Sequence, residues 1–204
     1  MGKIEEVSRV IHRTWNLKRE ISGITVECVD GDIASQEGFD CVVNAANAQL
    51  KPGGGVAGAI HRKAGPGLDR ECRNHAPIRP GEAVITKGHN LPNPYVIHCL
   101  GPIYGVDEPA DKLLGKCYRN ALLKGEEKGL ESLAFPSIST GIFGYPMIEA
   151  AEIAVRAIIL VAPHLKSVKR VRFVLHGDEA LAIHQRALSS LTSKTLDGLS
   201  PEKG

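Results

Sequence analysis

Apolar and polar positions follow one another along this chain in blocks that predict alternating strands and helices. Short apolar runs predict strands at 24–29, 41–43, 82–87, 95–100, 132–137 and 171–175. Apolar residues at helical spacing predict helices at 56–73, 111–128, 147–161 and 179–191. This alternation predicts an α/β fold in which helices cover both faces of one sheet.

The segment 82–100 indicates that the sheet is mixed. Its two predicted strands are joined by the turn Asn90-Leu91-Pro92-Asn93-Pro94, which is too short to hold a crossover helix. This pair is therefore expected to be antiparallel. We expect a mixed, mostly parallel sheet of about six strands.

The two ends of the chain differ from its middle. Residues 1–20 carry Ile4, Val7, Ile11 and Trp15 at helical spacing, which predicts an amphipathic helical extension packed on the main domain. The main domain is expected to span residues 21–192. Residues 193–204 are polar and are predicted to form a flexible tail.

The composition narrows the class of partner. The net charge is only +2 and aromatic residues make up 4%, so the basic, aromatic-rich face of a nucleic-acid binder is not expected. The longest apolar run, 157–162, is far shorter than the roughly 20 residues of a membrane span. The five cysteines include no C-x-x-C pair, which favours free thiols in a reducing cytoplasm, and the eight histidines lack metal-ligand spacing. We therefore expect a cytoplasmic protein without nucleic-acid or membrane partners, metal or cofactor.

Candidate binding residues follow the predicted strands, where ligands of open α/β sheets bind. Directly after the first strand lies Gly31-Asp32-Ile33. The Asp32 carboxylate could accept a hydrogen bond from an adenine amino group, and the Ile33 N–H could donate to a ring nitrogen. The alternative is that Asp32 caps a short helical turn at 34–37.

A second candidate loop follows the strand at 41–43. Asn44-Ala45-Ala46-Asn47 leads to Gly53, Gly54, Gly55, Val56 and Ala57 at the start of a predicted helix. Consecutive glycines leave backbone N–H groups unshielded, and a helix N-terminus attracts anions. This pattern predicts a phosphate site.

The third loop joins the strand at 132–137 to the next helix. It contains Ser139, Thr140, Gly141, Ile142, Phe143 and Gly144. Two such loops on neighbouring strands can hold a pyrophosphate from both sides. Phe143 could pack against a sugar or against the core.

A nicotinamide-dinucleotide fold is disfavoured, although Gly53, Gly55 and Gly58 match G-x-G-x-x-G. The six residues 47–52 separate the strand from the first glycine, and Ile78 and Arg79 occupy the place of the required acid. A P-loop is excluded because the chain contains no Gly-Lys-Ser/Thr.

Together these motifs resemble the macrodomain family over residues 23–191. The resemblance rests on Gly31-Asp32-Ile33, Val42–Asn47, Gly53–His61 and Ser139–Gly144, in that order and spacing. It implies a three-layer α/β/α sandwich that binds ADP-ribose or its derivatives, including ADP-ribosylated proteins. Adenine would lie at Asp32 and Ile33, bordered by residues 175–178. The diphosphate would lie between Gly54–Ala57 and Ser139–Gly144, and the distal ribose near Asn47, Gly55 and Phe143.

The resemblance leaves two functions open, a hydrolase of ADP-ribose derivatives and a non-catalytic reader. The most active hydrolases of this family carry an aspartate where this chain has Ala57, so a carboxylate base is missing. We expect a slow hydrolase in which the substrate's own diphosphate activates water. Asn47, holding the ribose, and Gly55, holding the water, are the candidate catalytic residues. His61 lies one helical turn beyond Ala57 and either faces the cleft or packs inside the helix layer.

Overall fold

The computed structural model describes residues 17–197, with side chains up to Thr192. Its central layer is a seven-stranded sheet in the order β1-β2-β7-β6-β3-β5-β4. The strands are β1 (Lys18–Ile21), β2 (Ile24–Asp30), β3 (Cys41–Ala45), β4 (Ala83–Lys87), β5 (Tyr95–Cys99), β6 (Ser132–Phe135) and β7 (Arg170–Leu175).

The predicted mixed, mostly parallel sheet is confirmed. Strands β2, β7, β6, β3 and β5 are parallel neighbours, whereas the edge strands β1 and β4 are antiparallel to β2 and β5. The hairpin expected at 82–100 is present, with Ala83 opposite Cys99 and Lys87 opposite Tyr95. Because the five parallel strands point the same way, their carboxyl ends meet at one edge of the sheet.

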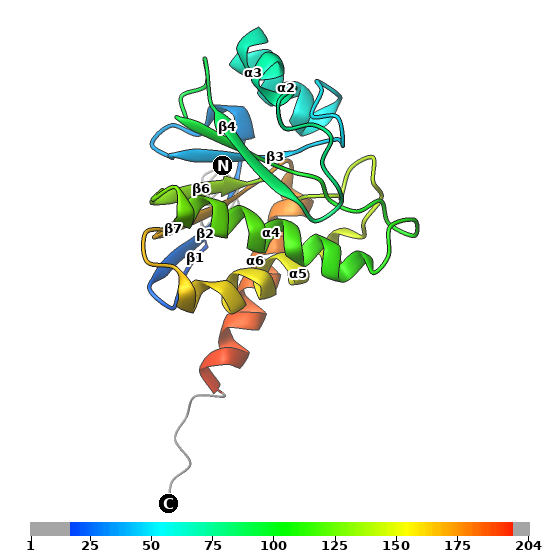
Figure 1. Ribbon diagram of the computed structural model, residues 1–204. Coiled ribbons are helices and arrows are strands. Elements are labelled where there is room, and N and C mark those ends of the chain that lie inside the picture. Colours follow the sequence, from blue (N-terminus) through cyan, green and yellow to red (C-terminus); the bar gives the residue numbers. More distant parts are fainter. Residues whose placement is uncertain (1–16, 198–204) are drawn as a thin grey trace, which may run out of the picture.

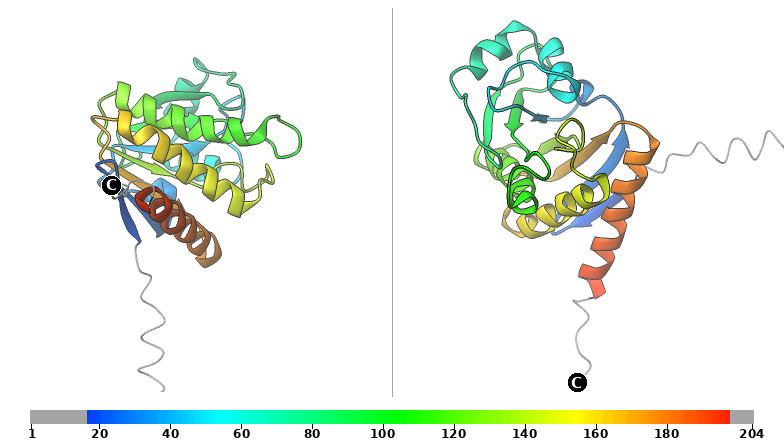
Figure 2. Two further views of the ribbon diagram at one scale, coloured as in Figure 1. Left: turned by 90° about the horizontal axis from the view of Figure 1, so that it is seen from below. Right: turned by 90° about the vertical axis from the view of Figure 1, so that its right-hand side faces the viewer.

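Helices cover both faces of the sheet, as Figure 1 shows. Three long helices lie side by side below it in that view and are seen from underneath in Figure 2: α4 (Ala110–Glu127), α5 (Met147–Val161) and α6 (Asp178–Asp197). The opposite face carries α2 (Gly55–Ala64) and α3 (Pro66–Cys72), together with the short 3-10 helix η1 (Ile33–Ser35). A second 3-10 helix, η2 (Ala162–His164), ends α5.

Each face of the sheet has its own hydrophobic core. On the side of α4, α5 and α6, the buried rings of Tyr118, Phe135 and Phe173 contact one another, with centroids 5.5 to 6.4 Å apart. The core under α2 and α3 is built from aliphatic side chains such as Ile60 and Leu68. Strands buried on both faces explain the continuous apolar runs in the sequence.

The structure differs from the sequence prediction at both ends of the described chain. Residues 18–20 were expected in a helix, yet Lys18–Ile21 is a strand paired with β2. The turn between them holds Ser22 and Gly23 with φ of 48° and 82°, the left-handed geometry that suits a two-residue hairpin. Helix α6 extends to Asp197, so residues 193–197, expected in the tail, are helical. Residues 1–16 of the predicted N-terminal helix, and residues 198–204, lie outside the described residues.

The helix expected at 56–73 is divided into α2 and α3. Gly65 lies between them with φ of 77°, and Pro66 begins α3. Proline lacks an N–H and its ring clashes with the preceding helical turn, so the helix must restart there. The division leaves the first turn of α2, which carries the glycine-rich loop, in place.

Candidate functional site

The loops that the sequence singled out lie at the carboxyl edge of the sheet. The loop after β3 carries Asn47 and the triglycine run, and the loop after β6 carries Ser139–Gly144. Strands β3 and β6 are direct neighbours, so their two loops are adjacent in space. A ligand site between them is the arrangement expected at the edge of an open α/β sheet.

The two loops enclose a cleft of about 330 Å³. Across it, a Cβ placed on Gly54 would lie 3.9 Å from Cδ1 of Ile142, so the loops face each other at close range. Ten of the predicted site residues line this cleft: Asn47, Gly53, Gly54, Gly55, Val56, Ala57, Ser139, Gly141, Ile142 and Phe143.

The glycine-rich side of the cleft presents backbone N–H groups. Gly55 begins α2 with φ of 52°, and the N–H groups of Gly55, Val56 and Ala57 belong to the first helical turn, where no intrahelical acceptor exists. Gly58 closes this turn against the loop, because a Cβ there would overlap the Gly53 carbonyl oxygen. The result is a helix N-terminus whose donors point toward the cleft, a favourable place for an anion.

The opposite side of the cleft also carries free donors. Among the hydrogen bonds of residues 17–197, none is donated by the backbone N–H groups of Thr140, Gly141, Ile142 or Phe143. The loop is closed by a bond between its two ends, in which Tyr145 N donates to the Ser139 carbonyl at 3.0 Å. The unbonded N–H groups of Gly141, Ile142 and Phe143 therefore border the same cleft as the first turn of α2, and such a pair of donor sets suits a diphosphate.

Within the described part of the chain, no residue that lines the cleft has an ionisable side chain. The lining consists of glycine, alanine, small hydroxyl residues, one asparagine and a few apolar side chains. Attraction for an anion must therefore come from main-chain dipoles, and no side chain in the lining can act as a carboxylate or imidazole base. Ala57, 6% exposed, occupies the place where the resemblance expects an aspartate.

Asn47 is fastened to its own loop. Its Nδ2 donates to the Lys51 carbonyl at 2.7 Å, and its Oδ1 accepts from the Lys51 N–H at 3.1 Å. The side chain borders the cleft close to Gly53. Asn47 thus shapes the loop that leads to the triglycine run, and a ligand would have to share or replace these bonds.

Asp32 and Ile33 lie outside the cleft, at the end of β2. Asp32 accepts from Ala34 N at 2.9 Å and from the Ser35 hydroxyl at 3.1 Å, so it caps η1 as the alternative reading expected. Ile33 is buried in the core under α2. Strand β2 is three strand spacings, about 14 Å, from β3, so only an extended ligand could reach both ends of the edge.

The segment 175–178 joins the same end of the edge. Gly31 N donates to the Leu175 carbonyl and Gly177 N donates to Asp30 Oδ1, both at 2.9 Å. His176 beside them is exposed. These bonds hold the loops after β2 and β7 together, where the resemblance places the adenine.

His61 does not line the cleft, which favours the packed alternative. It is 5% exposed, its ring lies 6.4 Å from that of His98, and neither ring nitrogen has a partner in the described part of the chain. Burial lowers the pKa of His61. Beneath the cleft, His98 bridges Asn44 and Thr86 at 3.0 and 2.9 Å, and burial lowers the pKa of His98 to about 3.

Several other residues near the cleft differ from the prediction. Thr140 and Gly144 belong to the loop but do not line the cleft. The cleft is completed by Ala45 and Ala46 of the second predicted loop, by Ser137 and Ile138 just beyond β6, and by Gly101, which no motif indicated. Gly101 lies two residues beyond the end of β5, a parallel neighbour of β3, so the strand-end rule could have found it.

The described residues show no competing metal or membrane feature. Between 17 and 197, no group of three metal-ligating side chains is gathered, and no helix has the length and apolar character to cross a bilayer. A larger groove, of about 630 Å³, lies between α4 and α5 and is lined mainly by side chains of those helices. Its described lining includes Tyr145 but none of the residues of Gly53–Ala57 or Ser139–Gly144, so the smaller cleft remains the candidate site.

The fold and cleft define a sandwich domain with a backbone-lined cleft at the carboxyl edge of its sheet. The sequence matches the Macro domain family over residues 43–154, and the chain belongs to this family. It is 44% identical over 169 residues to the O-acetyl-ADP-ribose deacetylase of Klebsiella pneumoniae, covering 80% of this chain and 96% of that protein.

Solved structures agree with this assignment. The macrodomain of Oceanobacillus iheyensis with ADP is 42% identical, with a TM-score of 0.83 over 88% of this chain and 97% of that one. The Trypanosoma brucei macrodomain in complex with ADP-ribose is 34% identical, with a TM-score of 0.75 over 80% of this chain and 68% of that one. The predicted family and sandwich fold are confirmed.

Proposed function

We propose that this chain binds ADP-ribose derivatives in the cleft and hydrolyses them slowly. The observation that carries the proposal is a pair of adjacent loops, Gly53–Ala57 and Ser139–Phe143, whose unbonded backbone N–H groups border one cleft. The comparisons support it, because a relative 44% identical is named a deacetylase of O-acetyl-ADP-ribose and a similar structure contains ADP-ribose.

The arrangement at the sheet edge supports one orientation of the ligand. The diphosphate lies between the two loops, where helix α2 and the second loop supply donors to its oxygens. The adenine extends toward Asp32, Ile33 and residues 175–178, and the distal ribose lies against Asn47, Gly55 and Phe143. Phe143 is partly buried against the core and also borders the cleft, so its ring can do both tasks.

Hydrolysis in this cleft uses groups of the substrate. A water held near Gly55 attacks the carbonyl carbon of an acetyl or glutamyl ester on the ribose and gives its proton to a diphosphate oxygen. The acyl carbon–oxygen bond breaks, the ribose oxygen takes up the proton, and ADP-ribose and a carboxylic acid leave. Turnover is slow because none of the described side chains in the lining is a general base, which contributes typically about 10²–10⁴ in rate.

Ala57 favours a second candidate function, a reader that binds without turnover. The same two loops would hold ADP-ribose attached to a protein, and the absence of an ionisable lining would keep the linkage intact. In that case ADP-ribosylated proteins are partners, and hydrolysis is incidental.

Turnover of two substrates measured side by side separates the two functions. O-acetyl-ADP-ribose and a protein ADP-ribosylated on glutamate are incubated with the wild-type chain and with Gly54→Leu, whose side chain would fill the cleft toward Ile142. A hydrolase releases ADP-ribose faster than the blocked variant does. Equal release by both, with ADP-ribose still binding the wild type, assigns the chain to the readers.

A further inference from the structure

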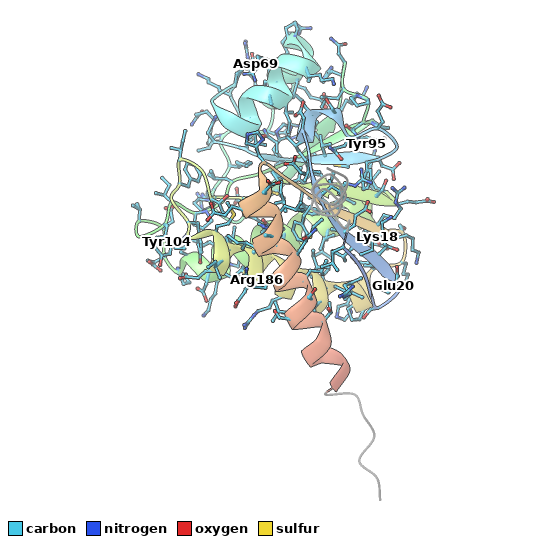
Figure 3. The ribbon with its side chains drawn as sticks, turned by 180° about the vertical axis from the view of Figure 1, so that it is seen from behind. Lys18, Glu20, Asp69, Tyr95, Tyr104 and Arg186 are labelled. Carbon is cyan, nitrogen blue, oxygen red and sulfur yellow. The ribbon has the colours of Figure 1, made fainter. Side chains whose placement is uncertain are left out.

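A second surface borders the cleft at the end away from Asp32. Among the described residues, six large hydrophobic side chains are exposed, and three of them lie together on the loop after β5: Ile103, Tyr104 and Val106. Val106 is 69% exposed and Tyr104 45%. We call these three residues the apolar ledge. Tyr104 projects from the margin of the molecule in Figure 3.

The apolar ledge is continuous with the cleft. Gly101, two residues before it, lines the cleft, and Tyr104 N donates to the carbonyl of the cleft residue Phe143 at 2.9 Å. The ring of Tyr104 also packs against the ring of Tyr145, with centroids 4.8 Å apart. A group leaving the cleft past Phe143 would therefore meet the ledge.

The ledge is formed before any ligand arrives. Ile103 N donates to the Asp107 carboxylate at 2.8 Å, and Val106 N and Asp107 N both donate to the Ile103 carbonyl, at 3.1 and 3.0 Å. These bonds fix the loop that carries the exposed side chains. A preformed surface loses little conformational entropy on binding, which favours affinity.

Several carboxylates lie beside this surface. Asp107 and Glu108 lie in the ledge loop, and Asp111 lies in the first turn of α4, which follows this loop. Burial raises the pKa of Tyr145, and the nearby carboxylates of Asp111, Glu149 and Glu108 add to the increase. The ledge is thus an apolar strip with an acidic border, complementary to a segment that carries apolar and basic side chains.

We infer that the apolar ledge binds the polypeptide of an ADP-ribosylated protein, next to the modified residue, and prefers apolar and basic neighbours there. This inference rests on the proposed function, because ADP-ribose in the cleft anchors the polypeptide. The ledge gives this chain a preference for modified proteins over O-acetyl-ADP-ribose, whose acetyl group is too small to contact Ile103 and Val106 together.

Calorimetry with two ligands tests the inference. One is free ADP-ribose, and the other is ADP-ribose joined through a stable amide to a peptide with leucine and arginine beside the modified position. The wild type is expected to bind the peptide ligand about tenfold more tightly, a gain within reach of two partly buried apolar side chains. Ile103→Ser with Val106→Ser removes the gain and leaves the affinity for free ADP-ribose within about twofold. Glu108→Lys is expected to reduce the gain for the peptide ligand, because it repels the arginine, and to leave the affinity for free ADP-ribose unchanged.

The matched control is Leu160→Ser, which removes a side chain 73% exposed on α5, outside the ledge and the cleft, and leaves both affinities unchanged. Equal affinities of the wild type for peptide ligand and free ADP-ribose would overturn the inference while the proposed function stands. Loss of affinity for both ligands in the double variant would also overturn it, as would a dimer in sedimentation that the double variant abolishes. Failure of the wild type to bind free ADP-ribose would instead refute the proposed function.

Discussion

Gly101 and Ser139 approach so closely that a Cβ on Gly101 would overlap the Ser139 hydroxyl oxygen. Ser139 is held at φ of 67°, its hydroxyl is buried, and that hydroxyl has no partner among the described residues. A non-glycine residue in the left-handed region is strained and often lies at a functional site. The contact sets the position of the second loop against the end of β5.

Gly101→Ala is therefore expected to displace Ser139 and Ile138 and to open the cleft. Overpacking at such a contact costs about 1–3 kcal/mol of stability, and we expect the affinity for ADP-ribose to fall about tenfold or more. Chemical denaturation and calorimetry measure the two effects.

The matched control is Gly115→Ala on α4, where a Cβ would meet Ile153 at an ordinary 3.7 Å. Alanine in a helix is more favourable than glycine by about 0.5–1 kcal/mol, so this variant should be more stable and bind normally. A Gly101→Ala variant with unchanged affinity would show that the contact does not shape the site.

Ala57→Asp is expected to raise hydrolysis of O-acetyl-ADP-ribose without abolishing binding. The aspartate would line the cleft in the first turn of α2, where the helix dipole favours a carboxylate. It would supply the missing base, worth up to about 10²–10⁴ in rate. Turnover against pH should show a new acidic limb in the variant. Ala57→Asn, similar in size but unable to take a proton, should stay at the wild-type rate. Equal rates for aspartate and asparagine would contradict the missing-base account.

Asp32 is expected to have two separable tasks. Asp32→Ser keeps a capping hydroxyl for η1, so stability should change little, whereas Asp32→Ala loses the cap and about 0.5–2 kcal/mol. Both variants lose the carboxylate that would accept from adenine, so affinity for ADP-ribose should fall by about 1.5–3 kcal/mol in each. Unchanged affinity in the serine variant would leave Asp32 with its capping task alone.

Stability is expected to fall as the pH is lowered from 7 toward 4. Burial lowers the pKa of His98 to about 3 and that of His184 to about 4, from an ordinary value of 6.5. Between pH 6.5 and these lowered pKa values, the unfolded chain takes up protons that the buried histidines of the folded chain exclude. Protonation therefore favours unfolding. Urea denaturation across this range should give a shallower pH dependence for His98→Gln, by about one proton. At pH 8 the imidazole is neutral in both states, so any difference there reports packing alone. An identical pH dependence of stability in the wild type and in His98→Gln would show that His98 does not cause the loss of stability.

Most of the fold could be predicted because its signals are local. Helix α5 was expected at 147–161 and is Met147–Val161, since a strongly apolar helix between a proline and a turn has clear ends. Strand β1 was not predicted because it has only four residues, three of them charged. Its local signal is the Ser22-Gly23 turn that follows it. Its pairing with β2 is a tertiary contact that periodicity does not encode.

The cleft could be predicted in part, because a glycine-rich segment that follows a strand is a local signal of a ligand-binding loop. What the sequence could not give is which loops meet. Gly101 belongs to a different strand, and its approach to Ser139 depends on the order β6-β3-β5. The burial of His61 could not be predicted either. Helical spacing places His61 beside Ala57, but it does not show which side of α2 packs against the sheet.

Titration of the wild-type chain with ADP-ribose and with NAD tests the central claim most directly. If two backbone loops hold the diphosphate and the distal ribose is enclosed by Asn47 and Phe143, one ADP-ribose binds per chain at micromolar affinity. NAD, whose nicotinamide extends that ribose, then binds much more weakly. Equal affinity for the two ligands, or no heat with ADP-ribose, would contradict the account.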